Sequence, residues 1–167
     1  MKQSDKLQKK FGELKEKRRL ARQVDFLARL KDELDIELRF ASDLDEISVE
    51  RTPAKYLCPR KYMGHELAKL SLAEASNTEL CKAFLSHAVG ESRKWSLFYV
   101  SDEKYGDCWL KVDTTTIQKL VAYEIENANL RMGFECLLAD PIAGDIIGIF
   151  EDEYDFHICK YSEKSNQ

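Results

Sequence analysis

The stretch that decides the fold lies near the end of the chain and reads Asp145-Ile-Ile-Gly-Ile-Phe150, Glu151-Asp-Glu153 and Tyr154-Asp-Phe-His-Ile-Cys-Lys-Tyr161. Residues 146–150 are apolar apart from Gly148, a pattern typical of a strand that is buried on both faces and central in its sheet. Residues 154–159 alternate between apolar and polar side chains, which predicts a half-buried neighbouring strand. Because three residues are too few for a crossover, we expect the two strands to form an antiparallel hairpin.

The connection within this hairpin is acidic. Its carboxylates surround one tyrosine, Tyr154, and belong to Glu151, Asp152, Glu153 and Asp155. One interpretation is a solvated turn whose charge discourages pairing with another sheet edge. A second is a docking surface for a basic protein. A third is a carboxylate site for Mg²⁺ or Ca²⁺, but no EF-hand spacing supports it, and we predict neither a metal nor a cofactor.

The segments upstream of the hairpin predict the rest of one sheet. Residues 95–101 and 108–112 are rich in aromatic and β-branched side chains, and they predict two strands joined by a turn at 102–107. The capping box Thr115-x-x-Gln118 predicts a helix that ends at Gly133, and residues 134–139 predict another strand. The order from residue 95 is therefore β-β-α-β-β-β. This order predicts an α+β fold in which a helix packs on one face of an antiparallel sheet.

The N-terminal part of the chain is predicted to be helical. Apolar residues recur at spacings of three and four over residues 4–39, which indicates an amphipathic helix, or two with a break near Gly12. Alternation over residues 35–40 favours a strand there. The capping boxes Ser71-x-x-Glu74 and Ser76-x-x-Glu79 predict the start of a helix that runs to Val89. We divide the chain into a helical basic segment, 1–40, and an α+β domain, 41–167, although the two could also form a single domain.

Charge is distributed unevenly along the 167 residues, whose net charge is −4. Residues 1–24 carry nine Lys or Arg and three Asp or Glu, so the remainder of the chain is strongly acidic. The basic N-terminal segment and the acidic C-terminal part could attract each other within one chain or between chains. Nucleic acid is the weaker alternative partner for the basic helix, since no aromatic side chains interleave the cations. The cations concerned are Lys15, Lys17, Arg18, Arg19 and Arg22.

Cysteine usage and hydropathy predict the compartment. The five cysteines, at positions 58, 81, 108, 136 and 159, are odd in number and widely spaced, which argues against a disulfide framework and against a zinc knuckle. The chain shows no signal peptide and no apolar run that approaches the length of a membrane span. We therefore expect a cytoplasmic protein without a membrane partner.

One short motif favours an enzyme. The segment Tyr105-Gly-Asp-Cys-Trp109 resembles the surroundings of the nucleophile in papain-like and transglutaminase-like cysteine enzymes, where Gly-x-Cys-Trp recurs. The resemblance implies a cysteine-dependent hydrolase or acyltransferase with Cys108 as nucleophile and His157 as general base. In those families the cysteine opens a buried helix, whereas the residues after Cys108 predict a strand. We therefore expect a protein that is not an enzyme.

In composition and layout the chain resembles the small cytosolic immunity proteins of bacterial toxin–immunity pairs, which are acidic α+β domains without a catalytic set. The resemblance implies a non-catalytic inhibitor that neutralises a basic toxin or nuclease domain through an acidic surface. A homodimer through the N-terminal helix stays open. The expected partner contacts are the acidic and tyrosine side chains of the two turns, namely Asp102, Glu103, Tyr105, Asp107, Glu151, Asp152, Glu153, Tyr154 and Asp155.

Overall fold

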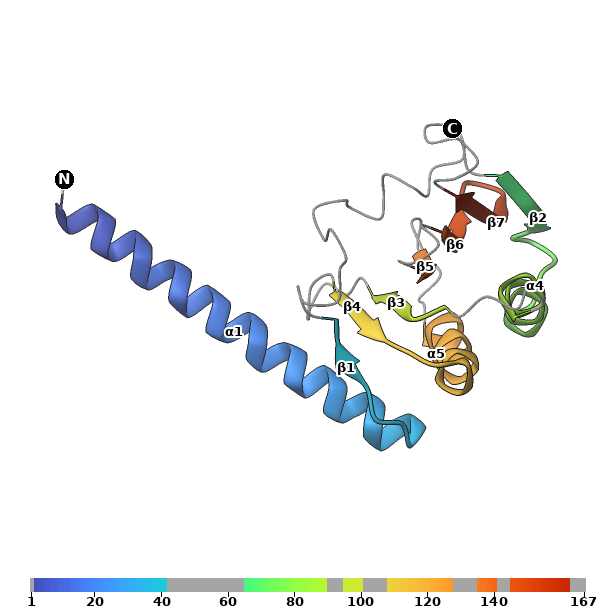
Figure 1. Cartoon of the computed structure of the whole chain (residues 1–167). Helices are drawn as coiled ribbons and strands as arrows, with labels where there is room; N and C mark the ends of the chain where they lie inside the picture. The colour runs from blue at the N-terminus through green and yellow to red at the C-terminus, as the bar shows by residue number, and fades with distance from the viewer. Residues whose placement is uncertain are drawn as a thin grey trace.

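A sheet of seven antiparallel strands forms the centre of the computed structural model, which describes residues 2–41, 65–89, 95–100, 108–127, 135–140 and 145–162 (Figure 1). The strands are arranged in the order β1-β4-β3-β5-β6-β7-β2. Their bounds are β1 Arg39–Phe40, β2 His65–Ser71, β3 Leu97–Val100, β4 Cys108–Lys111, β5 Glu135–Asp140, β6 Asp145–Glu151 and β7 Asp155–Ser162. The helices are α1 Lys2–Leu34, α4 Asn77–Val89 and α5 Thr114–Asn127. These helices and strands confirm the predicted α+β fold. They also confirm the predicted order of elements along the chain from residue 95, which is β-β-α-β-β-β.

The predicted hairpin is confirmed as the pair β6–β7. Strand β6 lies between β5 and β7 and is antiparallel to both, and Gly148 is opposite Cys159. Ile147 and Ile149 are fully buried, as a central strand requires. Strand β7 in turn pairs with β2, which lies at the edge of the sheet.

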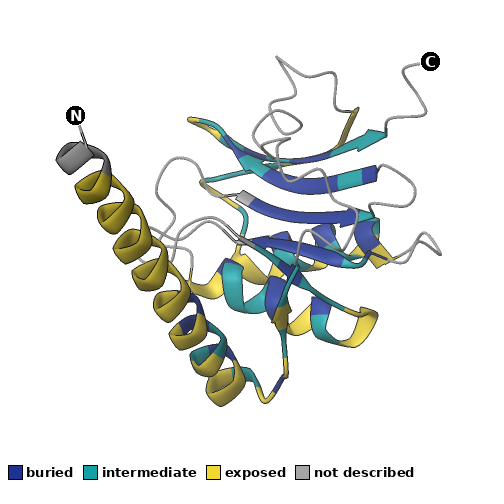
Figure 2. Ribbon diagram, turned by 60° about the vertical axis from the view of Figure 1, so that its left-hand side comes forward, coloured by how far each residue is buried: buried dark blue, intermediate teal, exposed yellow. Residues whose placement is uncertain are grey.

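One face of the sheet is covered by helices. Figure 2 shows α4 and α5 against this face, with the C-terminal end of α1 beside them. All three helices and the sheet contribute to one core cluster. Its largest fully buried members are Phe26 and Leu30 from α1, Leu80 and Phe84 from α4, Ile117, Leu120 and Ile125 from α5, and Phe98, Leu110 and Phe156 from the strands. Residues 26–36 thus pack with the body of the protein.

Helix α1 is continuous through Gly12, so the break expected there does not occur. The helix ends because Asp35 adopts φ 51°, a left-handed conformation that commonly terminates helices. The Asp35 N–H donates to the Lys31 carbonyl at 2.9 Å, and Lys119 Nζ donates to the Leu34 carbonyl at 3.0 Å. The strand expected over 35–40 is therefore limited to Arg39–Phe40.

The helix starts differ in detail from the predicted ones. In the box at α4, the Ser76 N–H donates to Glu79 Oε2 at 2.9 Å. The upstream box, Ser71-x-x-Glu74, starts no helix, because residues 65–71 form β2 and residues 72–74 a turn. At α5 the cap is Asp113 and not Thr115, since Asp113 Oδ1 accepts from the backbone N–H groups of Thr115 and Thr116 at 3.0 and 2.8 Å.

Within the described part of the chain, no helix combines the length and the apolar character needed to span a membrane. The sequence also predicts a short strand at 47–49 and a loop over 51–64, and both segments lie outside the described residues.

Candidate functional site at the β6–β7 turn

Asp152 organises the turn between β6 and β7. Its Oδ1 accepts hydrogen bonds from the backbone N–H groups of Tyr154 and Asp155, both at 2.9 Å, and its own N–H donates to the Asp155 carbonyl at 3.0 Å. The bond from the Tyr154 N–H, followed by those from His157 and from the Asp155 N–H, lowers the pKa of Asp152 to about 2. The turn is therefore closed by a carboxylate that stays ionised at neutral pH.

His157 connects this turn to the edge strand. Its Nε2 lies 3.0 Å from Asp152 Oδ2, and its Nδ1 lies 2.5 Å from Oε2 of Glu66 on β2. Both contacts are hydrogen bonds at the same time only when both ring nitrogens carry hydrogen, because a carboxylate is an acceptor. Glu66 could not be recognised from sequence as a residue of this site, since it is 91 positions from His157 and β2 was not predicted.

Lys69 on β2 neutralises a second carboxylate of the turn. Its Nζ lies 2.7 Å from Asp155 Oδ2, and this hydrogen bond is the main cause that raises the pKa of Lys69. Lys69 is directly opposite His157 in the β2–β7 register. The edge strand thus supplies both Glu66 and Lys69 to the turn.

Glu151, unlike the other acids of the turn, is buried, with 8% of its surface exposed. As the last residue of β6 it shares the face of Ile147 and Ile149, because side chains alternate along a strand. It is therefore not part of an exposed docking surface, contrary to the expectation from sequence. The alternation of side chains along β6 was the pattern in the sequence that could have predicted the burial of Glu151.

Among the described residues outside α1, Tyr154 is the most exposed large hydrophobic residue, with 73% of its surface accessible. Its backbone is nevertheless held on both sides, because its N–H donates to Asp152 and its carbonyl accepts from the Leu72 N–H at 2.9 Å. Glu153 beside it is exposed, and Leu67 on β2 is 37% exposed. We call these residues, together with Glu66, Asp152 and Asp155, the turn surface.

The turn surface is acidic and contains a set of possible metal ligands. Asp155 contacts Lys69, Glu66 and Asp152 contact His157, and the carboxylate of Glu153 is exposed. Ligand atoms of Asp152, Asp155 and His157 lie within 4.8 Å of one another and could hold a divalent cation. Such an ion would have to replace the contact of Lys69 with Asp155 and that of His157 with Asp152.

The structure does not bring the two members of the cysteine-enzyme pair together. Cys108 is on β4 and His157 is on β7, with β3, β5 and β6 between them. At the usual spacing of neighbouring strands, four steps across the sheet amount to about 19 Å, well beyond hydrogen-bond reach. The alternative site at Cys108 and His157 is therefore wrong on geometry.

The remaining predicted contacts lie elsewhere. Asp102, Glu103, Tyr105 and Asp107 are outside the described residues. The cations proposed for nucleic acid are all exposed on α1, and Arg19 forms an ion pair with Glu16 at 2.6 Å.

A comparison of the chain with protein-family models, with curated proteins and with solved structures finds no significant match. The resemblance to immunity proteins therefore stays a prediction.

Proposed function

We propose that the protein is a non-catalytic protein-binding module that captures its partner through the turn surface. The observation that carries the proposal is Tyr154, whose ring is exposed while its backbone is fixed by hydrogen bonds to Asp152 and Leu72. An exposed aromatic ring on a fixed backbone loses little conformational entropy on binding. Tyrosine is also enriched among the residues that dominate binding energy at interfaces.

The charge of the turn surface favours a basic partner. Glu153 is exposed beside Tyr154, and Glu66 is exposed on the neighbouring strand. Carboxylates around a central aromatic anchor would steer a positively charged protein towards the anchor and speed association. We propose a basic toxin or nuclease domain as the partner, and inhibition of that domain as the role of the complex.

The test is the capture of a partner by two variants at exposed apolar side chains. Tyr154→Ala removes the anchor, and Val24→Ala, which truncates an α1 side chain that is 64% accessible, is the control. The partner is isolated from the native host's lysate with the wild-type protein and then titrated in purified form. We expect Tyr154→Ala to weaken its affinity about 30-fold, which corresponds to an anchor worth about 2 kcal/mol.

Charge reversal of the whole segment 151–153 would not test the proposal, because Glu151 is buried and Asp152 closes the turn. The single change Glu153→Lys is better, since Glu153 is exposed. We expect it to slow association with a basic partner and to leave the unfolding midpoint unchanged. Equal affinities of wild type, Tyr154→Ala and Val24→Ala for the purified partner would refute this function for the turn surface.

A further inference from the structure

The N-terminal part of α1 carries apolar side chains that the protein itself does not cover. Leu7, Phe11 and Leu14 are 58%, 74% and 53% exposed. Their spacing of four and three residues places them on one side of the helix. Figure 2 shows this part of α1 as exposed. We call residues 6–22 the α1 arm and these three residues its apolar stripe.

The stripe is not an extension of the face that anchors α1 to the core. That face begins at Gln23 and continues with the buried residues Phe26 and Leu30. At 3.6 residues per turn, the centre of the stripe lies about 110° around the helix axis from the direction of Phe26 and Leu30. The packing that holds α1 against the sheet therefore cannot cover the stripe, and another surface is needed.

The charge of the arm restricts what that surface can be. Residues 6–22 carry eight Lys or Arg and two Glu, and all of them are exposed. Two arms paired with each other would bring these cations together, and like charges in contact oppose association. Nucleic acid would match the charge but would leave Leu7, Phe11 and Leu14 in water. The arm thus fits a surface that is both acidic and partly apolar.

The turn surface of this protein has both properties. In the described residues outside α1, the exposed large hydrophobic side chains are Leu67, Val89 and Tyr154. Two of these three belong to the turn surface, where Glu66 and Glu153 are exposed beside them. The turn surface thus offers apolar contact for the stripe and carboxylates for the cations of the arm.

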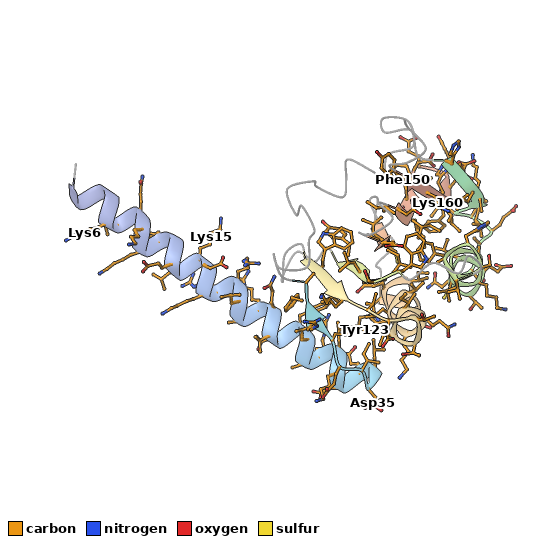
Figure 3. All side chains as sticks on the ribbon, viewed as in Figure 1. Lys6, Lys15, Asp35, Tyr123, Phe150 and Lys160 are labelled. Atoms are coloured by element: carbon orange, nitrogen blue, oxygen red, sulfur yellow. The ribbon has the colours of Figure 1, made fainter. Side chains whose placement is uncertain are left out.

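The two surfaces cannot meet within one molecule. Figure 1 shows the N-terminal end of α1 directed away from the sheet, while β7 and β2 lie at the opposite end of the molecule. In Figure 3, Lys6 and Lys15 on the arm are likewise far from Phe150 and Lys160 in the hairpin. Contact between the surfaces therefore requires a second molecule.

We propose that the α1 arm docks on the turn surface of a second copy of this chain. This inference rests on the proposed function, because it names an occupant of the same surface. The arm of a second copy and the basic partner compete for Tyr154, so self-association holds the turn surface covered until the partner displaces the arm.

The experiment is sedimentation velocity over a range of concentrations, with an arm variant and a turn variant. The arm variant combines Leu7→Gln, Phe11→Gln and Leu14→Gln, which keeps good helix propensity. The turn variant is Tyr154→Ala. We expect the wild type to associate, with a dissociation constant that rises with salt. We expect Tyr154→Ala to weaken the association about 30-fold, which corresponds to an anchor worth about 2 kcal/mol. Circular dichroism spectra equal to that of the wild type show that both variants are folded.

A mixture of the arm variant and the turn variant distinguishes docking of the arm on the turn surface from other modes of self-association. Each variant alone is expected to be monomeric at concentrations where the wild type associates. An equimolar mixture regains a dimer, because the arm of the turn variant fits the intact turn surface of the arm variant. A monomeric wild type, association that survives Tyr154→Ala, or a mixture that stays monomeric would each overturn the inference. None of these results affects capture of a basic partner by monomeric protein, which the titration with Tyr154→Ala measures separately.

Discussion

Two phenylalanines on the same helix should differ sharply in their contribution to stability. Phe26 is 1% exposed and packs in the main core cluster, with the Arg29 guanidinium carbon 5.5 Å from its ring centre, whereas Phe11 is 74% exposed. Replacing a fully buried phenylalanine with alanine removes its transfer free energy and leaves a cavity, at a cost of about 3–5 kcal/mol. The same replacement at the exposed position of Phe11 should change the free energy of unfolding by no more than about 0.5 kcal/mol.

Phe26→Ala and Phe11→Ala are a matched pair, because both exchange the same two residue types in the interior of α1. The gain in helix propensity is the same for both and cancels in the comparison. Urea unfolding is followed by circular dichroism at low protein concentration and high salt, where self-association is weak. With a slope of about 2 kcal/mol per molar urea, the midpoint of Phe26→Ala should fall by about 2 M relative to Phe11→Ala. Midpoints that agree within the error of the fit would refute the division of α1 into an anchored end and a projecting arm.

Two further predictions concern pH and thiol reactivity. The folded-state pKa of Asp152 is about 2, below its ordinary 3.8, so its stabilising contribution is complete above about pH 4 and is lost as the pH falls towards 2. The melting temperature of the wild type should therefore drop in this window, and Asp152→Asn should flatten the drop; an unchanged slope would show that Asp152 does not close the turn. Burial raises the pKa of the Cys136 thiol well above its usual value. At neutral pH, mass spectrometry should find Cys136 unmodified by iodoacetamide in the native protein and modified in urea, whereas rapid labelling of the native protein would contradict its placement in the core.

The hairpin and the order of strands and helix along the chain from residue 95 could be predicted from sequence because their signals are local. A fully apolar run at β6, alternation along β7 and a three-residue connection determine strands and pairing within a short window. The helix α4 was predicted for the same reason, since its capping box at Ser76 and Glu79 lies within four residues.

Strand β2 was missed because its signal is not local. The sequence His65-Glu-Leu-Ala-Lys-Leu-Ser71 contains good helix formers, and only its pairing with β7 makes it a strand. Since β2 was missed, so were the partners that it supplies to the turn, Glu66 and Lys69. The capping box at Ser71 was misleading because it follows this strand directly.

The burial of Glu151 shows how a charge count can mislead. A run of three acids indicates an exposed turn, yet the first of them is still part of β6 and shares the core side of that strand. The position of α1 was likewise beyond prediction, because apolar spacing identifies a helix without showing which of its turns meet the core. Phe26 and Leu30 are buried whereas Leu7 and Phe11 are exposed, although each pair has the spacing of four residues that is typical of an apolar helix face.

Photocrosslinking in cells of the native host can show whether the turn surface binds a basic protein through Tyr154. Tyr154 is replaced by the photoreactive p-benzoylphenylalanine, which keeps an aromatic ring at the turn, and the same residue at the exposed position of Lys82 on α4 is the control. We expect position 154 to form adducts with a basic protein and with a second copy of this chain, and position 82 to form neither. No adduct between position 154 and a basic protein above the level of the control would contradict the proposed function of the turn surface.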